Sequence, residues 1–432
     1  MTETATRTEP ERVEPDSETV LALRRNWGPP IAYLVLGLLA LLVFGIFAEG
    51  GKTATFGLST RTDAIQLDPL AVPAKPTSIV LAVGCLLATG YAFRLTSKGR
   101  RTPLWLPIVF GILFVLSFLS WAVGGAAISL TGLLQGALAL AVPFIFGALC
   151  GMVGERSGVI NIAIDGQLLF GAFLSGVVAS LSGNLWVGLI AAPIAGVMVA
   201  WLLAIFTIKY FVNQIIVGVV LNVLVYGVTN FLYGSLLGPE QETWNSPGKF
   251  GKLEIPLLSD IPVIGPVLFN QTIIVYVMYV VVAVVHVALF HTRWGLRVRA
   301  VGEHPEAADT AGIDVNSVRF RNVLIGGAIA GFGGAFFTLA QQGIFSKEMT
   351  AGAGFIALAA MIMGRWTPIG AVFAALLIGF ADNLQSVLGI IGFPIPSELM
   401  AMTPYLLTIL AVAGLVGRIR PPAANGVPYI KS

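Results

Sequence analysis

Charged residues are scarce in this chain of 432 residues: Asp, Glu, Lys and Arg make up 11%, against about 25% in typical soluble domains. Hydrophobic residues make up 56%. No polar stretch is long enough for a separate soluble catalytic domain. The formal net charge of +3 is small for this length, which argues against nucleic acid as a partner. The composition therefore indicates a membrane protein.

Residues for metal and redox chemistry are also few. The two cysteines, Cys85 and Cys150, both lie in apolar runs, so a structural disulfide or a cysteine metal site is not expected. The three histidines show no metal-ligand spacing with carboxylates, and no Ser/His/Asp arrangement is present. The chain is therefore expected to hold no metal and to catalyse no covalent reaction.

Apolar runs long enough to cross a bilayer recur along most of the chain. A membrane-spanning helix needs about 20 residues. One run, 354–364, is short for a full crossing and is a candidate half-helix or re-entrant helix. The sequence predicts an all-α polytopic membrane protein with about twelve hydrophobic spans, at 30–48, 78–94, 104–123, 130–150, 163–181, 185–206, 214–235, 272–291, 321–341, 354–364, 368–387 and 402–417.

Basic residues give this membrane topology an orientation, because short cytoplasmic segments are enriched in Lys and Arg. With the N-terminus inside, most basic residues near the span ends fall on the cytoplasmic side. Residues 1–26 are polar and acidic, which predicts a disordered cytoplasmic tail and not a cleavable signal peptide. We expect a multi-pass protein of the plasma membrane with both termini cytoplasmic and six basic residues outside, namely Lys52, Arg61, Lys75, Lys249, Lys252 and Lys347.

The polar loop at 293–313 separates two spans and contains a helix-forming core, Glu306-Ala307-Ala308. Pro305 suits the first helical position, Glu306 complements the helix N-terminus and Gly312 is a natural stop. A short helix is therefore predicted at the membrane surface. An ordinary connector is the alternative. The spacing Glu-Ala-Ala-x-x-x-Gly resembles the coupling-helix loop of ABC importer permeases, which implies docking of an ATPase through Gly302, Glu303, Glu306, Ala307, Ala308 and Gly312.

A second informative stretch, 151–173, places five glycines and several polar side chains between two apolar runs. Irregular backbone at membrane depth is tolerated only inside protein or along water. The stretch resembles the signature of the nucleoside and simple-sugar branch of ABC importer permeases, Gly-Glu-x-x-Gly-x-x-Asn-Ile-x-x-Glu-Gly-Gln. Asp165 replaces the usual Glu, and the residues that match are Gly154, Glu155, Gly158, Asn161, Ile162, Gly166 and Gln167.

This resemblance covers about 130–417 and implies a permease domain there, with 27–129 as additional N-terminal spans and 418–432 as a cytoplasmic tail. It also implies the partners: an ABC ATPase subunit that binds ATP and Mg, a second related permease and an extracytoplasmic substrate-binding protein. No cofactor is expected on this chain, whose other partners would be the bilayer and a small-molecule substrate.

Polar side chains inside apolar runs are candidates for a substrate pathway. Each candidate also has a purely structural interpretation. Asp165 and Asn161 could cap or order the start of their own span, and the other side chains could form interhelical hydrogen bonds. The Gly-rich run 326–334 is explained by close helix packing. The candidate pathway residues are Asn161, Asp165, Gln167, Asn222, Tyr226, Asp382 and Asn383.

Three functions remain open from the sequence. The leading hypothesis is the membrane-spanning subunit of a nucleoside ABC importer that works by alternating access. The second is a simple-sugar or branched-chain amino acid permease of the same architecture. The third is an ion- or proton-coupled secondary transporter that uses Asp165 and Asp382 as a titrating pair.

Overall fold

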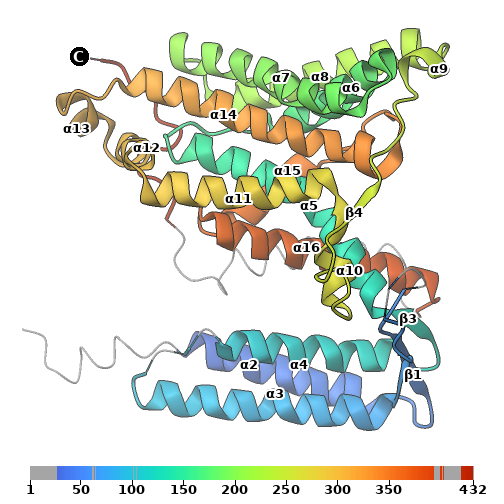
Figure 1. Cartoon of the computed structure of the whole chain (residues 1–432). Coiled ribbons are helices and arrows are strands. Elements are labelled where there is room, and N and C mark those ends of the chain that lie inside the picture. Colours follow the sequence, from blue (N-terminus) through green and yellow to red (C-terminus); the bar gives the residue numbers. More distant parts are fainter. Residues whose placement is uncertain are drawn as a thin grey trace, which may run out of the picture. The chain divides into compact units, whose positions relative to one another are not determined.

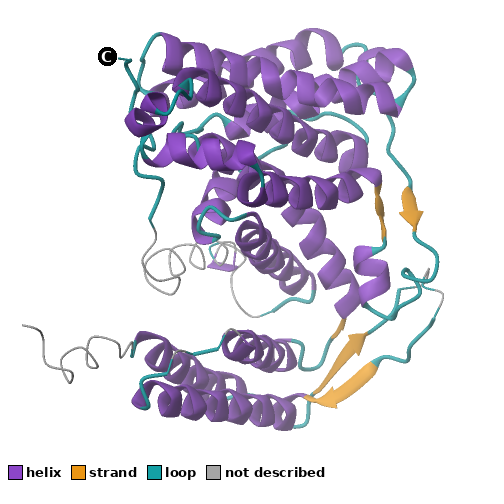
Figure 2. Ribbon diagram, turned by 60° about the vertical axis from the view of Figure 1, so that its left-hand side comes forward, coloured by secondary structure: helices purple, strands orange, loops and turns teal. Residues whose placement is uncertain are grey.

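The computed structural model describes residues 27–60, 63, 65–100, 102–103, 105–393, 399–400, 402 and 420–431. These residues form two compact units. The first contains residues up to Phe56 together with Leu70–Ala127, and the second contains Gly57–Pro69 and the chain from Ile128 onward. Helices dominate each unit, and the strands are short (Figure 2).

The first unit contains three long apolar helices. Its helices are α2 (Gly28–Leu39), continued by the π-helical turn η1 (Ala40–Ile46), α3 (Ala74–Ser97) and α4 (Trp105–Ala122). Strands β1 (Thr53–Gly57) and β2 (Leu70–Pro73) pair in antiparallel fashion, with Thr53 opposite Pro73. β3 (Ala127–Ser129) lies where the chain enters the second unit. Phe44, Ala40 and Ala82 form a small core between these helices.

The second unit is a larger bundle of helices (Figure 1). Its helices and turns are α5 (Leu130–Glu155), α6 (Ile164–Ser182), α7 (Leu185–Ala204), η2 (Ile205–Lys209), α8 (Gln214–Leu232), η3 (Tyr233–Leu237), α9 (Gln241–Trp244), α10 (Ile264–Leu268), α11 (Ile273–His291), α12 (Arg293–Glu303), α13 (Pro305–Thr310), α14 (Val315–Ala335), η4 (Phe336–Gln342), α15 (Ala353–Met363) and α16 (Pro368–Ile390). β4 (Lys252–Glu254) and β5 (Asn270–Thr272) form a two-stranded sheet in the connection before α11.

Ten helices of the described chain are long and apolar enough to cross a membrane. They correspond to ten of the twelve predicted spans. The short run at 354–364 is α15, an apolar helix of 11 residues, as its length predicted. The predicted span at 402–417 lies outside the described residues, apart from residue 402.

Burial separates central from peripheral helices. In α5, 83% of an apolar stretch of 18 residues is buried, whereas the buried share of such a stretch in α11 is 28%. Because the bilayer is itself apolar, the exposed apolar faces of α8 and α11 suit contact with lipid. α5 therefore forms the centre of the second unit, with α6, α14, α15 and α16 packed against it.

Glycines allow α6, α7 and α14 to approach at backbone contact. A Cβ on Gly196 would lie 1.9 Å from the carbonyl oxygen of Gly327, and one on Gly171 would lie 2.6 Å from that of Gly331. Such distances leave no room for any side chain. The sequence prediction that the Gly-rich run 326–334 serves close helix packing is confirmed.

Candidate functional site

The connection between α5 and α6 is irregular backbone enclosed by other helices. α5 ends at Glu155, and the left-handed φ of +92° at Gly158 turns the chain where a Cβ would lie 2.7 Å from Nη2 of Arg319. Side chains of α8 form hydrogen bonds with backbone N–H and carbonyl groups of this connection. The Ile160 N–H donates to Oε1 of Gln214 (2.7 Å), and Nδ2 of Asn222 donates to the Ile162 carbonyl (2.9 Å). The signature stretch is therefore held by hydrogen bonds that a second helix provides.

Asn161, Gln167 and Cys150 form a buried polar cluster beside this connection. Nδ2 of Asn161 lies 3.0 Å from Oε1 of Gln167 and 3.3 Å from Sγ of Cys150, and its Oδ1 accepts from the Ala163 N–H. The Cys150 thiol donates to the same Gln167 oxygen. Asn161 thus orders the backbone at the start of α6, which the sequence analysis gave as the alternative to a role in the substrate pathway. The Nε2 of Gln167 has no hydrogen-bond partner among the described residues.

The carboxylate of Asp165 is fully buried and ties α6 to another part of the bundle. Its Oδ1 accepts from the Gly354 N–H (2.7 Å), and its Oδ2 accepts from the hydroxyls of Thr350 (3.2 Å) and Tyr226. The sequence offered a cap of its own helix as the structural reading of Asp165. Asp165 does act as a cap, but the helix is a different one. Ala163 is the N-cap residue of α6, whereas the Asp165 carboxylate accepts from the Gly354 N–H in the first turn of α15.

The segment before α15 has a strained backbone. Glu348 and Ala351 have φ values of 54° and 46°, in the left-handed region that side chains rarely adopt, and Gly352 follows at 80°. Such residues cost about 1 kcal/mol or more each and persist where surrounding contacts hold them. Nδ2 of Asn230 donates to Oε1 of Glu348 (2.9 Å), and Asp165 holds Thr350 and Gly354. The segment is thereby fixed from both α6 and α8.

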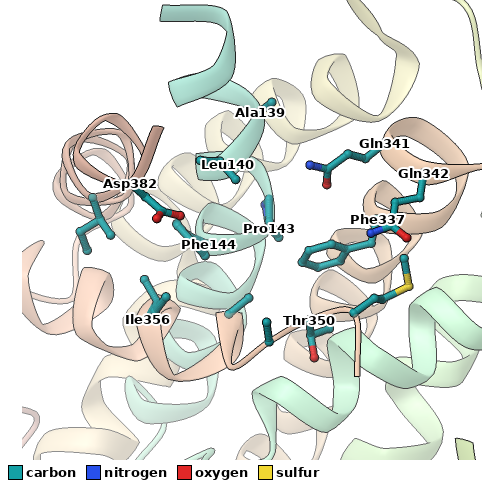
Figure 3. A pocket seen from close by; sticks show the side chains of 14 residues that line it. Ala139, Leu140, Pro143, Phe144, Phe337, Gln341, Gln342, Thr350, Ile356 and Asp382 are labelled. Carbon is teal, nitrogen blue, oxygen red and sulfur yellow. The ribbon is translucent and has the colours of Figure 1, made fainter. Parts of the chain in front are cut away.

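This strained segment forms part of the wall of a cavity of about 340 Å³. α5, η4, α15 and α16 provide the other walls. Asp382 lines one side, and Gln341, Gln342 and Phe337 line the other (Figure 3). π-helical turns are often found at functional sites, and η4 carries both glutamines. The volume lies within the range of about 300 to 1,000 Å³ that is typical of small-molecule sites.

The predicted pathway residues therefore divide into three groups. Asn161, Asp165, Gln167, Asn222 and Tyr226 meet around the start of α6. Asp382 lies apart from them and faces the cavity, whereas Nδ2 of Asn383 donates to the Leu133 carbonyl (2.7 Å) as an interhelical hydrogen bond. Gln341 and Gln342 were missed by sequence reasoning. The sequence feature that could have indicated them is a pair of adjacent amide side chains at the end of an apolar run.

The predicted surface helix is α13, preceded by α12, a second helix that the sequence did not predict. Pro305 is at the first helical position of α13, and Gly312 follows it with φ of 81°. Glu306 and Ala307 are exposed, whereas Ala308 is 4% exposed and packs with Val301, Val315 and Tyr429. α13 thus has one free face and one face that packs on the protein.

Residues 420–431 lie against the loop that carries α12 and α13. The Gly302 carbonyl accepts from the Ala424 N–H (2.9 Å), and Oε2 of Glu303 accepts from the Ala423 N–H (3.3 Å). Lys431 pairs with Asp309 of α13 at 3.3 Å. Figure 1 shows the C-terminal end of the chain on the same side of the second unit as α12 and α13.

The same C-terminal segment reaches the signature stretch. Glu155 is 5% exposed and accepts from Nδ2 of Asn425 (3.0 Å) and from Nε1 of Trp366 (2.6 Å). Arg319 is 2% exposed and donates to the carbonyls of Ser157 (3.1 Å) and Val427 (2.7 Å). The turn after α5, the start of α14 and the C-terminal segment are therefore joined by hydrogen bonds from buried side chains.

Asp314 begins α14 directly after the α13 loop. Its side chain accepts from the backbone N–H of Ser317 (3.0 Å), and this hydrogen bond holds the pKa of the Asp314 carboxyl below its usual value. The cap is therefore ionised at neutral pH, where its charge favours the positive N-terminus of α14.

Comparison with known proteins gives a family for this arrangement. The family profile described as "Branched-chain amino acid transport system / permease component" matches residues 133–412. The guanosine ABC transporter permease protein NupQ of Bacillus subtilis is 41% identical over 303 residues, which cover 68% of this chain and 95% of that protein. The nucleoside ABC transporter permease protein NupC of Lactococcus lactis subsp. cremoris is 40% identical, with the same coverage.

A putative glucose ABC transporter permease protein, TsgC13 of Haloferax volcanii, is 34% identical over 59% of this chain and 77% of its own length. No solved structure matches the chain. The matched residues 133–412 contain the signature stretch, the cavity walls and the loop of α12 and α13. The chain belongs to the family of branched-chain amino acid transport system permease components.

Proposed function

We propose that this chain is the membrane-spanning subunit of an ABC importer for nucleosides. Identity of 41% and 40% to the guanosine and nucleoside ABC permeases, over 95% of each, carries this proposal. The relation to a putative glucose permease is weaker at 34% identity, which makes a simple sugar the second candidate substrate.

The geometry of α13 supports coupling to a separate ATPase subunit. Its inner side packs through Ala308, while Glu306 and Ala307 are exposed to a partner. ATP and Mg would bind to that partner, and closure of its dimer would pull on α13. Coupling requires that the docked face prefer one ATPase state, because a ligand shifts an equilibrium only through differential affinity.

The remaining partners and the orientation belong to the same proposal. A second related permease would complete the pore, and an extracytoplasmic binding protein would deliver the substrate. Basic residues lie together at the end of the bundle that carries α12: Arg293 and Arg299 belong to α12, and the guanidinium of Arg156 lies over the same Phe290 ring as that of Arg299. Since cytoplasmic segments are enriched in such residues, we assign this end and the C-terminal segment beside it to the cytoplasm. A cytoplasmic N-terminus, which the basic residues of the sequence predict, belongs to the same proposal.

A proton-coupled secondary transporter is less well supported. Asp165 accepts hydrogen bonds from three donors and caps α15, so its carboxylate is engaged within the protein and does not face the cavity with Asp382. Uptake that persists without the ATPase subunit and stops when the proton gradient collapses would favour that function instead.

The substrate is tested by uptake of labelled guanosine into cells that contain the complete complex. Unlabelled nucleosides, ribose, galactose and leucine serve as competitors. Competition by nucleosides alone is expected. Competition by a sugar or by leucine alone would assign the chain to another substrate class of its family.

Coupling is tested at α13. Ala307→Asp should leave the protein in the membrane and abolish both guanosine uptake and substrate-stimulated ATP hydrolysis, because a charge is added to the free face. Ala307→Ser is the matched control and should retain uptake. Ala308→Asp is less specific, since it places a charge in the packed face under α13. Normal uptake by the Ala307→Asp protein would contradict docking at this helix.

A further inference from the structure

The cavity contains a carboxylate without a described partner. Asp382 is half-buried in α16, and its carboxylate makes no hydrogen bond or ion pair with the residues that the structure describes. Ionisable side chains within membrane-spanning helices are costly and mark substrate or ion pathways. Asp382 therefore differs from Asp165, whose carboxylate is saturated by protein donors.

Two amides face the same cavity from η4. The side chain of Gln341 makes no hydrogen bond with the described residues, and Gln342 uses its Oε1 for the hydroxyl of Ser346 (3.1 Å). Each amide can donate as well as accept. The cavity thus presents acceptors from Asp382 on one side and mixed donors and acceptors on the other (Figure 3).

The remaining cavity surface is apolar and partly aromatic. Phe337 and Phe144 are 9% and 5% exposed and line the cavity together with Pro143 and Ile356. A few polar groups in an apolar pocket are typical of sites that orient a small molecule. Aromatic faces suit a planar base, and a carboxylate suits a sugar diol, since it accepts hydrogen bonds from both hydroxyls.

We propose that this cavity is the nucleoside-binding site of this subunit. In it the Asp382 carboxylate accepts hydrogen bonds from the ribose hydroxyls, and the Gln341 and Gln342 amides bind the edge of the base beside Phe337. This inference rests on the proposed function and adds the residues that select the substrate.

The charge of the cavity selects against phosphorylated substrates. Among the described lining residues Asp382 is the charged one, and no Lys or Arg accompanies it. A phosphate would meet a carboxylate without a cation to offset it, and like charges at a binding site oppose each other. The site is therefore built for nucleosides and not for nucleotides.

The test is a comparison of KM for guanosine and for 2′,3′-dideoxyguanosine, which lacks the ribose diol, in uptake by the complete complex. Asp382→Asn should raise KM for guanosine by roughly 10- to 100-fold, the range for hydrogen bonds to a charged group, and change KM for the dideoxy compound far less. Gln341→Met, which keeps the length and removes the amide, should raise both KM values alike.

Ser386→Ala is the matched control, because Ser386 lies one turn beyond Asp382 on α16 and does not line the cavity. It should leave both KM values unchanged. Variants are compared at equal amounts of protein in the membrane. Guanosine monophosphate should compete with wild-type uptake at least tenfold more weakly than guanosine, which is the effect of about 1.4 kcal/mol.

Each contrary result is informative. No guanosine uptake by the wild-type complex overturns the proposed function and this site with it. Wild-type uptake with an unchanged preference for guanosine in the Asp382→Asn protein overturns the site alone. An equal loss for both compounds, together with a dependence on Na⁺ or on the proton gradient, assigns Asp382 to an ion, and equal competition by the monophosphate overturns the selection against phosphate.

Discussion

Two buried or half-buried aspartates in neighbouring parts of the second unit have opposite surroundings. The carboxylate of Asp165 accepts from Gly354, Thr350 and Tyr226, whereas that of Asp382 has no partner among the described residues. A buried charge is tolerated when hydrogen bonds replace its hydration. The carboxylate of Asp165 therefore holds a cavity wall, whereas the carboxylate of Asp382 keeps its acceptors unused by the described residues, as the proposed nucleoside site requires.

Removal of the Asp165 carboxylate should destabilise the protein. Asp165→Ala leaves the Gly354 N–H and two hydroxyls without an acceptor, and losses of about 3 kcal/mol are usual when one partner of such a buried network is removed. Asp165→Asn retains one acceptor and should cost less. Thermal unfolding of the purified protein in detergent measures both.

Asp382→Asn is the control for this experiment and should leave the melting temperature close to that of the wild type. A melting temperature for Asp165→Ala equal to the wild-type value would show that the hydrogen bonds to Asp165 do not stabilise the segment before α15.

Local pattern predicted which residues of the signature stretch are special but not what they contact. Asn161, Asp165 and Gln167 stood out because polar residues are rare in apolar runs. The partners are Tyr226 of α8, Thr350 of the segment before α15 and Gly354 of α15, and tertiary packing alone brings them to Asp165. Gln341 and Gln342 were missed because two amides at the end of an apolar helix resemble an ordinary exposed terminus.

At the scale of elements, the C-terminal segment 420–431 acts as a support for α12 and α13. It bonds to Gly302 and Glu303, packs Tyr429 under α13 and reaches Glu155 through Asn425. Three parts of the chain that are far apart in sequence are joined in this way. The proposed docking helix therefore rests on the end of its own chain.

A chain that ends after Pro422 should lose this support. The residues of α12 and α13 should then exchange their amide hydrogens faster, because the hydrogen bonds from Ala423 and Ala424 and the packing of Tyr429 are gone. Hydrogen exchange of peptides from 293–313 in the purified complex measures this effect, and peptides from α7 provide an internal reference.

Lys431→Ala is the matched control, since it removes only the exposed ion pair with Asp309, which contributes about 0 to 1 kcal/mol. Its exchange in 293–313 should match that of the full chain. Unchanged exchange in the truncated chain would contradict a supporting role for the segment.

Hydrophobic pattern predicted the long helices closely, because a lipid-exposed or core helix must be apolar along its length. The prediction 104–123 compares with Trp105–Ala122, and 130–150 compares with Leu130–Glu155. α12 was missed because Arg293–Glu303 carries charges at many positions and reads as a loop. Its helix depends on the Thr292 cap and on the packing of Gly302 against the Arg156 carbonyl, a tertiary contact.

At the scale of the whole molecule, the family match and the division into units concern different parts of the chain. The match begins at residue 133, whereas the first unit ends at Ala127. Two relatives are matched over 95% of their length by 68% of this chain. The helices α2, α3 and α4 are therefore an addition to the matched part.

Removal of residues 1–126 should therefore preserve transport. We expect the truncated chain to enter the membrane and to take up guanosine, per molecule, at close to the rate of the full chain, because the cavity and the α13 loop lie in the remaining residues. Uptake normalised to the amount of protein in the membrane measures this.

The same truncation combined with Ala307→Asp is the control and should be inactive. A truncated chain that is inserted and assembled but does not transport would mean that the first three spans take part in the transport cycle.

The glycine contacts among α6, α7 and α14 have a mechanical consequence. Helices that pack at backbone contact resist tilting against one another, so we expect these three to move together as one group. Asp165 belongs to this group as a residue of α6. Arg319 belongs to it as a residue of α14 and donates a hydrogen bond to the Val427 carbonyl of the C-terminal segment. In the proposed coupling, a displacement of the α13 loop would move this group as a whole, and with it the cavity wall that Asp165 holds.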